Sequence, residues 1–133
     1  MDLVDIEGIG PTYAATLEGH GLTTAAHLLD QGATPAGRTA LAEKSGISPK
    51  LLLEWVNHAD LCRIKGVGSE YADLLEAAGV DTVPELAQRN AVNLHEALAS
   101  TNEQKKLVRR VPSESEVGDW VDEAKTLPRV VSY

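Results

Sequence analysis

Residues 64–69, Ile-Lys-Gly-Val-Gly-Ser, have a counterpart near the start of the chain at residues 6–11, Ile-Glu-Gly-Ile-Gly-Pro. The two stretches belong to a longer match in which each residue corresponds to one 58 positions further along the chain. The residues of the first copy that meet an identical residue at this offset are Asp2, Leu3, Ile6, Gly8, Gly10, Tyr13, Ala14, Leu17, Glu18, Gly21, Thr24 and Leu28. Agreement at this density indicates an internal duplication.

Each Gly-x-Gly stretch predicts a tight turn followed by a helix. Glycine lets the backbone turn and approach a neighbour without a β-carbon in the way, and we expect Gly10 and Gly68 to adopt positive φ. The helix that follows begins with N–H groups that attract phosphate or carboxylate oxygens. The flanking Ile6, Ile64 and Val67 are expected to seat the turn on the core. The pattern resembles the helix-hairpin-helix motif, present twice.

Composition limits the class of protein. A chain of 133 residues fits one compact domain or two very small ones. Phenylalanine is absent, so leucine, valine, isoleucine and alanine must form the core. The net charge of −8 opposes general attraction to nucleic acid or anionic membrane. The single cysteine, Cys62, excludes an intrachain disulfide and is expected to be buried. Because no signal peptide or membrane-spanning stretch is evident, we expect a cytoplasmic, bacterial protein.

Capping patterns divide the first half of the chain into helices. Thr24 and Thr34-Pro35 are typical of helix starts, and Ser48-Pro49 begins a helix that leads into the second hairpin. The residues expected to end helices are Gly21, Gly32, Gly46, Gly79 and Asn90.

In the second half, the expected helix starts are Asn93 and Thr101, with the later helix ending at Val111-Pro112. Ser113-x-x-Glu116 is a capping box for a last helix, which stops before Pro128.

The order of these helices predicts an architecture. The second hairpin is preceded by a helix within residues 49–62, whereas the first hairpin has no preceding helix. We therefore expect the last helix, at 116–127, to fold back onto the first hairpin, with Trp55 and Trp120 in equivalent buried places. The predicted fold is all-α: one pseudo-twofold domain over residues 1–133, made of repeats 2–59 and 60–127. Residues 128–133 are expected to form a short extended tail.

The full chain resembles a bacterial family of tandem helix-hairpin-helix proteins that is described only as a domain of unknown function. The resemblance rests on residues 64–68, on residues 75–83 (Leu-Glu-Ala-Ala-Gly-Val-Asp-Thr-Val), on the basic cluster at 105–110 and on the ending Pro128-Arg129-Val130-Val131. The family is sometimes likened to the DNA-binding region of flap-type nucleases. The resemblance implies nucleic-acid binding by the hairpin, and it transfers no catalytic residues.

The second hairpin is the first candidate binding site. Its expected phosphate ligands are the backbone N–H groups of the turn and two flanking cations: Arg63, Lys65, Gly66, Val67, Gly68 and Ser69. Such contacts hold the nucleic-acid backbone and do not distinguish sequences. The alternative is that these glycines serve only the turn and helix packing. That alternative is favoured for the first hairpin, where Asp5 and Glu7 would repel phosphate.

A basic cluster is the second candidate site. Its members fall at i, i+1, i+4 and i+5, which would place them on one helical face: Lys105, Lys106, Arg109 and Arg110. This face could bind phosphates or an acidic partner. Alternatively, it is a solvated face that pairs with the acidic residues between Glu114 and Glu123.

Other chemistry is weakly supported. Residues 41–52 resemble a helix-turn-helix, but they offer few side chains that read bases, so we interpret them as packing. His58 and Cys62 have the spacing of two metal ligands, and no further ligand completes a site. No nucleophile signature or two-metal carboxylate cluster stands out, and Tyr13 and Tyr71 are expected to be core residues. We therefore expect no cofactor, no metal and no enzymatic activity.

Two hypotheses about function follow. In the first, the chain is a non-catalytic module that binds the DNA or RNA backbone weakly and without sequence specificity. In the second, it is a protein–protein interaction adaptor that uses the hairpins or the helix expected at 105–110. Neither hypothesis involves a membrane.

Overall fold

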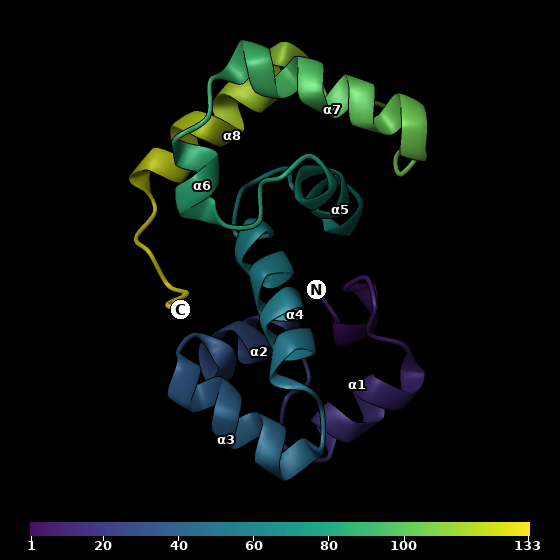
Figure 1. Cartoon of the computed structure of the whole chain (residues 1–133), viewed down its shortest axis with the longest axis vertical. Coiled ribbons are helices and arrows are strands. Elements are labelled where there is room, and N and C mark those ends of the chain that lie inside the picture. Colours follow the sequence, from purple (N-terminus) through teal and green to yellow (C-terminus); the bar gives the residue numbers. More distant parts are fainter. The chain divides into compact units, whose positions relative to one another are not determined.

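The computed structural model describes residues 1–133, and it is built from helices without strands (Figure 1). The chain forms two compact units: unit 1 holds Met1–Asp60 with Val130–Tyr133, and unit 2 holds Leu61–Arg129. Unit 1 contains a short 3₁₀ helix, η1 (Leu3–Asp5), and the helices α1 (Pro11–Glu18), α2 (Ala25–Gly32), α3 (Pro35–Ser45) and most of α4 (Pro49–Leu61). Unit 2 contains α5 (Ser69–Ala77), α6 (Val83–Ala87), α7 (Ala91–Lys105) and α8 (Glu114–Thr126). None of these helices has the length and apolar character needed to span a membrane.

The predicted caps at Thr24, Thr34 and Gly46 are confirmed, whereas Gly32 is the last residue of α2 and Ala33 is the C-cap. The Thr24 hydroxyl accepts a hydrogen bond from the N–H of His27 at the start of α2. The Thr34 hydroxyl accepts one from Gly37 N–H, with Pro35 as the first residue of α3. Gly46 then ends α3 at φ 74°, in the left-handed region where glycine carries no steric cost. Local side-chain chemistry therefore determines where these helices begin and end.

The core of unit 1 surrounds the first hairpin. Its fully buried large side chains include Leu3, Ile6, Leu17, Leu28 and Leu52. Trp55 of α4 is 2% exposed, and its ring lies 5.0 Å from the ring of Tyr13 at an interplanar angle of 60°. Tyr13 itself is 38% exposed, so the expectation that it is a core residue is wrong. The tyrosine instead covers the tryptophan on its solvent side.

Unit 2 repeats this arrangement with its own residues. Trp120 of α8 is 3% exposed, and its ring lies 5.3 Å from the half-buried ring of Tyr71. The largest fully buried side chains of this core are Leu61, Ile64, Leu74, Leu75, Leu86, Leu94 and Leu98. Cys62 is partly buried against the same core. The two tryptophans thus occupy equivalent buried places, each beside the hairpin of its own unit.

The expected position of the last helix is wrong. Helix α8 packs against α6 and α7, and its buried residues Val117, Trp120 and Val121 share a core with Ile64 and Val67 of the second hairpin. The first hairpin is covered by Trp55 of α4. The Gly-x-Gly turn is therefore near the start of each unit, and the tryptophan helix later in the chain packs in the same unit.

The helices expected after Asn90 also differ from the structure. Asn90 has φ −81° and caps the start of α7, where its side chain accepts a hydrogen bond from Asn93 N–H, 3.0 Å away. One helix then runs through both expected helix starts, Asn93 and Thr101, and ends before Lys106 at φ 52°.

A side-chain bridge explains why α7 stops there. The Asn102 amide donates to the Val108 carbonyl at 3.0 Å and accepts from Val108 N–H at 2.9 Å, so it closes a loop that the buried Val108 anchors. The prediction that the four basic residues share one helical face is therefore wrong. Lys105 ends α7, whereas Lys106, Arg109 and Arg110 lie in the loop that follows.

Candidate nucleic-acid interface

The second hairpin is fixed to unit 2 by its apolar residues. Ile64 and Val67 are buried, and Val67 N–H donates to the Ile64 carbonyl at 3.0 Å. Between them, Gly66 has φ +89°, a conformation that other L-residues rarely adopt. Gly68 has φ −93° and ψ −170°, an extended conformation open to any residue, and it is the N-cap of α5. The left-handed residue is thus the first glycine of the pair, and the expectation of positive φ at Gly68 is wrong.

The first and second glycines differ in the same way in both hairpins. A β-carbon on Gly66 would lie 3.3 Å from Nε1 of Trp120, and one on Gly8, at φ +91°, would lie 3.1 Å from Nε1 of Trp55. No atom lies within 4 Å of the corresponding positions on Gly68 and Gly10. The first glycine of each pair is therefore required by the turn and the tryptophan. The second is not required by packing within its unit.

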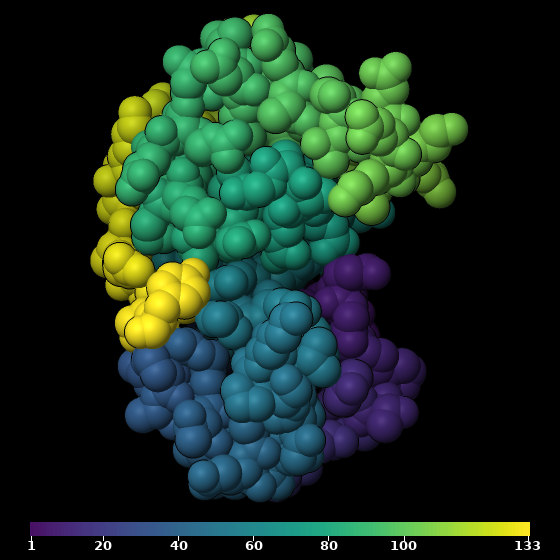
Figure 2. All heavy atoms as spheres, viewed as in Figure 1, coloured from purple at the N-terminus to yellow at the C-terminus, as the bar shows by residue number.

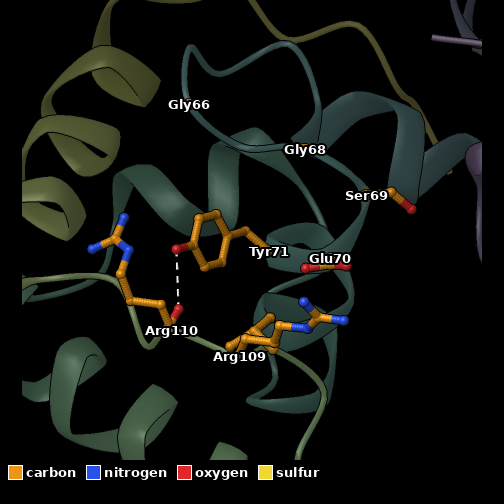
Figure 3. Close-up of a pocket in the computed structure, with 8 residues that line it drawn as sticks. Gly66, Gly68, Ser69, Glu70, Tyr71, Arg109 and Arg110 are labelled. Carbon is orange, nitrogen blue, oxygen red and sulfur yellow. Dashed lines mark hydrogen bonds between the residues drawn. The ribbon is translucent and has the colours of Figure 1, made fainter.

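The start of α5 faces an open cleft. A hollow of about 450 Å³ is lined by the residues of the hairpin, the first turn of α5 and the end of the 106–113 loop: Gly66, Gly68, Ser69, Glu70, Tyr71, Val108, Arg109 and Arg110 (Figure 3). The backbone N–H groups of Gly68 and Glu70 donate to no acceptor in the protein. Unpaired N–H groups at a helix start carry partial positive charge and suit an anion. The cleft therefore combines a helix N-terminus with the exposed guanidinium of Arg109.

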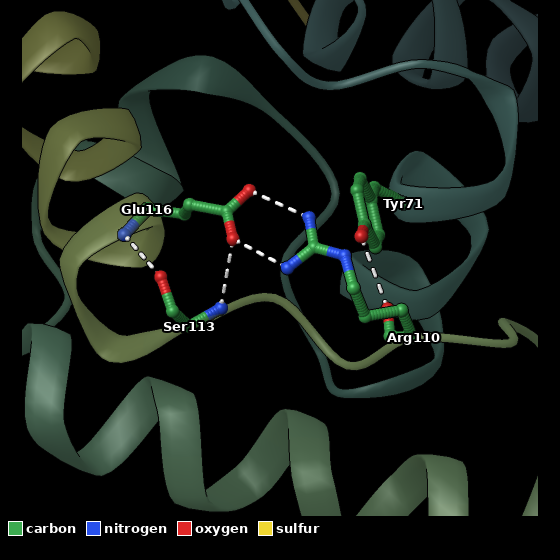
Figure 4. Close-up of polar contacts among 4 residues, drawn as sticks. All are labelled: Tyr71, Arg110, Ser113 and Glu116. Carbon is green, nitrogen blue, oxygen red and sulfur yellow. Dashed lines mark hydrogen bonds and ion pairs between the residues drawn. The ribbon is translucent and has the colours of Figure 1, made fainter.

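Arg110 lies beside this cleft but is neutralised by a carboxylate. Its guanidinium donates two hydrogen bonds to Glu116, at 2.7 and 3.0 Å, and Glu116 also accepts from Ser113 N–H in the predicted capping box of α8 (Figure 4). The hydrogen bond from Arg110 and those of the cap lower the pKa of Glu116 to about 2. The same pair raises the pKa of Arg110. Arg110 therefore holds the loop to α8 and offers little net charge to a ligand.

Tyr71 fixes the loop from the opposite side. Its hydroxyl donates to the Arg110 carbonyl at 3.0 Å (Figure 4). Its ring packs against Trp120. The loop that carries Arg109 is thus tied to both α5 and α8. This contact places Arg109 beside the hairpin, although 41 residues separate Gly68 from Arg109 along the chain.

The remaining predicted cations lie in less favourable surroundings. Arg63 donates to the Pro128 carbonyl at 2.9 Å. The backbone N–H of Lys65 donates to the carboxylate of Glu123, at 3.1 and 3.3 Å. A second hollow, of about 330 Å³, is lined by Lys65, Gly66, Trp120 and the acidic residues of α8, which are Glu116, Asp119 and Glu123. One side of the hairpin is therefore acidic.

The structure divides the predicted site. Gly66, Gly68, Ser69, Arg109 and Arg110 line one cleft, whereas the Val67 side chain is buried in the core. Lys105 and Lys106 do not line the cleft. Glu70, Tyr71 and Val108 also line the cleft and were not predicted from the sequence. The capping box at Ser113 would have identified Glu116 as a helix cap, but nothing in the sequence indicated that Arg110 would pair with it.

The first hairpin has the same turn and weaker means of binding an anion. Helix α1 begins with Pro11, which has no N–H, in the position where α5 begins with Ser69. The exposed side chains beside this turn include Asp5 and Glu7, in place of Arg63 and Lys65. The two hairpins therefore have the same turn geometry but differ at the helix that follows. Only the second hairpin has a backbone N–H at the first residue of its helix.

Comparison of the whole chain with curated proteins and with solved structures finds no match. A family model, described as a domain of unknown function (DUF4332), matches residues 7–127, which include all eight α-helices, the second hairpin and all of the first hairpin except Ile6. The chain therefore belongs to the DUF4332 family.

Proposed function

We propose that the protein binds the sugar–phosphate backbone of nucleic acids through its second hairpin, weakly and without reading sequence. The observation that carries this proposal is the open start of α5. Gly68 caps it without a side chain, no atom lies within 4 Å of the point where a β-carbon would stand, and the exposed Arg109 lines the same cleft. A phosphate oxygen can approach the amides of a glycine turn more closely than those of any other residue.

The proposal includes a tandem helix-hairpin-helix architecture. Each unit holds a Gly-x-Gly turn, a helix that begins after the second glycine, and a tryptophan against the first glycine. The shared tyrosine–tryptophan contacts support descent of the two units from one repeat. The pseudo-twofold relation and the single domain expected from the sequence remain predictions.

Weak binding follows from the charges around the cleft. Lys65 and Arg109 are exposed near the hairpin, and Lys105 and Lys106 are exposed at the end of α7. Acidic side chains of α8 stand on the other side of the turn, and the chain as a whole carries −8. Few phosphates can therefore be neutralised at once. Contacts to phosphate carry no sequence information, so the same weak affinity is expected for unrelated sequences.

The test is a fluorescence anisotropy titration with unrelated duplex, flapped and single-stranded oligonucleotides at low salt. We expect binding to all three, with log affinity falling linearly as log salt rises, because counterions are released from the neutralised phosphates. Arg109→Glu should abolish detectable binding, whereas Lys125→Glu, the same charge change on the exposed face of α8, should have a much smaller effect. Equal losses in the two variants would show that overall charge, and not the cleft, controls binding.

A second candidate function is an adaptor for a basic protein partner. The acidic side of the hairpin favours it, because Glu116, Asp119 and Glu123 line one hollow beside Gly66. In that case no oligonucleotide should bind at low salt, where electrostatic attraction is least screened. A basic partner captured by the wild-type chain should then be lost in an Asp119→Lys variant. The proposal includes no catalytic step and no cofactor.

A further inference from the structure

Residues 130–133 cover a surface of unit 1 that includes Ala33, Arg38 and Asn57, which we call the groove. Val131 is 2% exposed and belongs to the core of that unit. Ser132 N–H donates to the Ala33 carbonyl at 2.8 Å, and Tyr133 donates its hydroxyl proton to Oδ1 of Asn57 at 3.1 Å. In Figure 2 the end of the chain, in yellow, lies at the surface beside the blue residues of this unit. These contacts are those of an extended peptide seated in a binding site.

A buried arginine completes the groove. The Arg38 side chain, 6% exposed, donates to the Ser132 carbonyl at 2.6 Å. It also donates to the carbonyls of Gly32 and Ala33, at 2.8 and 3.2 Å, which are the last residue and the C-cap of α2. Burial lowers the pKa of Arg38, and the charge at Tyr133 acts in the opposite direction. A buried cation requires acceptors, so the groove favours a segment that brings a backbone carbonyl to this point.

Arg38 has acceptors in unit 1 other than residues 130–133. Arg38 is positioned by Gly32 and Ala33, both at the end of α2, and α3 is capped separately by Thr34. The seated residues, by contrast, follow α8 in an extended segment with exposed Pro128 and Arg129 and no helix or strand of its own. A short extended segment that packs on helices with caps and acceptors of their own can leave and return by local opening.

We propose that this groove is an exchangeable peptide site, and that it accepts residues 130–133 of a second copy of the chain. The chain leaves unit 1 after Asp60 and returns at Val130, so the segment is joined to its groove only through unit 2. An identical segment from another molecule offers the same valine, the same N–H and carbonyl at Ser132 and the same phenol. Exchange of an identical element between copies is a low-cost route to association.

The probe for this site is a synthetic peptide with the sequence of residues 128–133, added to the ¹⁵N-labelled full chain. In a Ser132→Pro variant the N–H that bonds to Ala33 is lost, so the chain's own segment should leave the groove. We expect the peptide to move the amide resonances of Ala33, Arg38 and Asn57 in this variant. In the matched Ser132→Ala variant, which keeps the N–H, the attached segment competes at an effective concentration of about 1 mM, and binding should weaken at least about tenfold.

Two further arms keep the test decisive. Val131→Asp removes the buried valine and so opens the groove even if Ser132→Pro leaves the segment in place. As a control, a peptide that carries the same Val131→Asp change should bind to neither variant. Arg38→Gln weakens the contact with the Ser132 carbonyl, so a chain with this change should hold its own segment poorly. Added unlabelled to the ¹⁵N-labelled Ser132→Pro variant, this full chain should reproduce the shifts caused by the peptide. The peptide site would be ruled out if both Ser132→Pro and Val131→Asp give folded spectra that the peptide does not change. It would also be ruled out if the peptide shifts the resonances of Ser132→Ala as much as those of Ser132→Pro. Shifts with the peptide but none with the whole chain would overturn the second copy as its occupant.

Discussion

The indole nitrogen of Trp120 lies against Gly66, 3.3 Å from the point where a β-carbon on that glycine would stand. The same contact joins Trp55 and Gly8 at 3.1 Å in the other unit. Both glycines have positive φ, so conformation and space exclude a side chain there. The second glycine of each pair is under neither constraint. Structure and proposed function therefore depend on different glycines of the same turn.

The different roles of the two glycines predict different effects on stability for the same substitution at each. Gly66→Ser should destabilise unit 2 by about 2 kcal/mol, because a non-glycine residue is strained at positive φ and the new side chain would crowd Trp120. Gly68→Ser should be neutral or slightly stabilising, since serine is a preferred N-cap and the space is open.

Thermal melts measure the difference, which should be roughly 10 °C in Tm between the two variants. Gly8→Ser and Gly10→Ser should reproduce it in unit 1. Similar melting temperatures for Gly66→Ser and Gly68→Ser would contradict the assigned roles.

The Arg110–Glu116 pair predicts a specific sensitivity to acid. The pKa of Glu116 is lowered to about 2 in the folded chain, so its ionised form favours folding. This contribution is present above the ordinary glutamate pKa near 4.3 and is lost as pH falls towards 2.

Glu116→Gln should therefore lower Tm at pH 7, and its difference from wild type should shrink between about pH 4.5 and pH 2. Glu114→Gln, a change in the same exposed first turn without an arginine partner, should show a smaller difference at pH 7. A constant gap between Glu116→Gln and wild type across this pH range would argue against the pairing.

The Asn102 bridge should control the loop that carries Arg109. Asn102→Ala removes both hydrogen bonds to Val108, and it should destabilise the closed loop by about 1–2 kcal/mol. Hydrogen exchange at the Val108 amide should then quicken roughly tenfold, with little change in α5. Gln104→Ala, at an exposed position of the same helix, is the control. Unchanged protection at Val108 would mean that the buried valine alone holds the loop.

Local signals in the sequence predicted much of the fold. Thr24, Thr34 and Ser113 each cap a helix through the side chain, as expected from short-range chemistry. The 58-residue offset located both Gly-x-Gly turns, and each has a buried tryptophan against its first glycine. Asn90 was misassigned because asparagine suits both a helix start and a left-handed end, and only the path of the chain after it distinguishes the two.

The rest depended on contacts between distant residues. The Asn102–Val108 bridge ended α7 before the basic cluster, although the residue types at 102–111 permit a helix. The pairing of α8 with the second hairpin followed from the core that Trp120 shares with Ile64. Spacing in the sequence could not distinguish that arrangement from packing on the first hairpin, because both bury the same face of the helix.

The most direct test of the proposed interface removes one unpaired N–H from the start of α5. Glu70→Pro removes the N–H of the second residue of α5, and proline is tolerated in the first turn of a helix, as Pro84 is in α6. Glu70→Ala is the matched control, because it loses the same carboxylate and keeps the N–H. Anisotropy titrations of both variants with one duplex at low salt, after equal melting temperatures are established, isolate this amide. We predict that Glu70→Pro weakens binding about tenfold relative to Glu70→Ala, the effect of a charge-assisted hydrogen bond to phosphate. Equal affinities for the two variants would contradict phosphate binding at the start of α5.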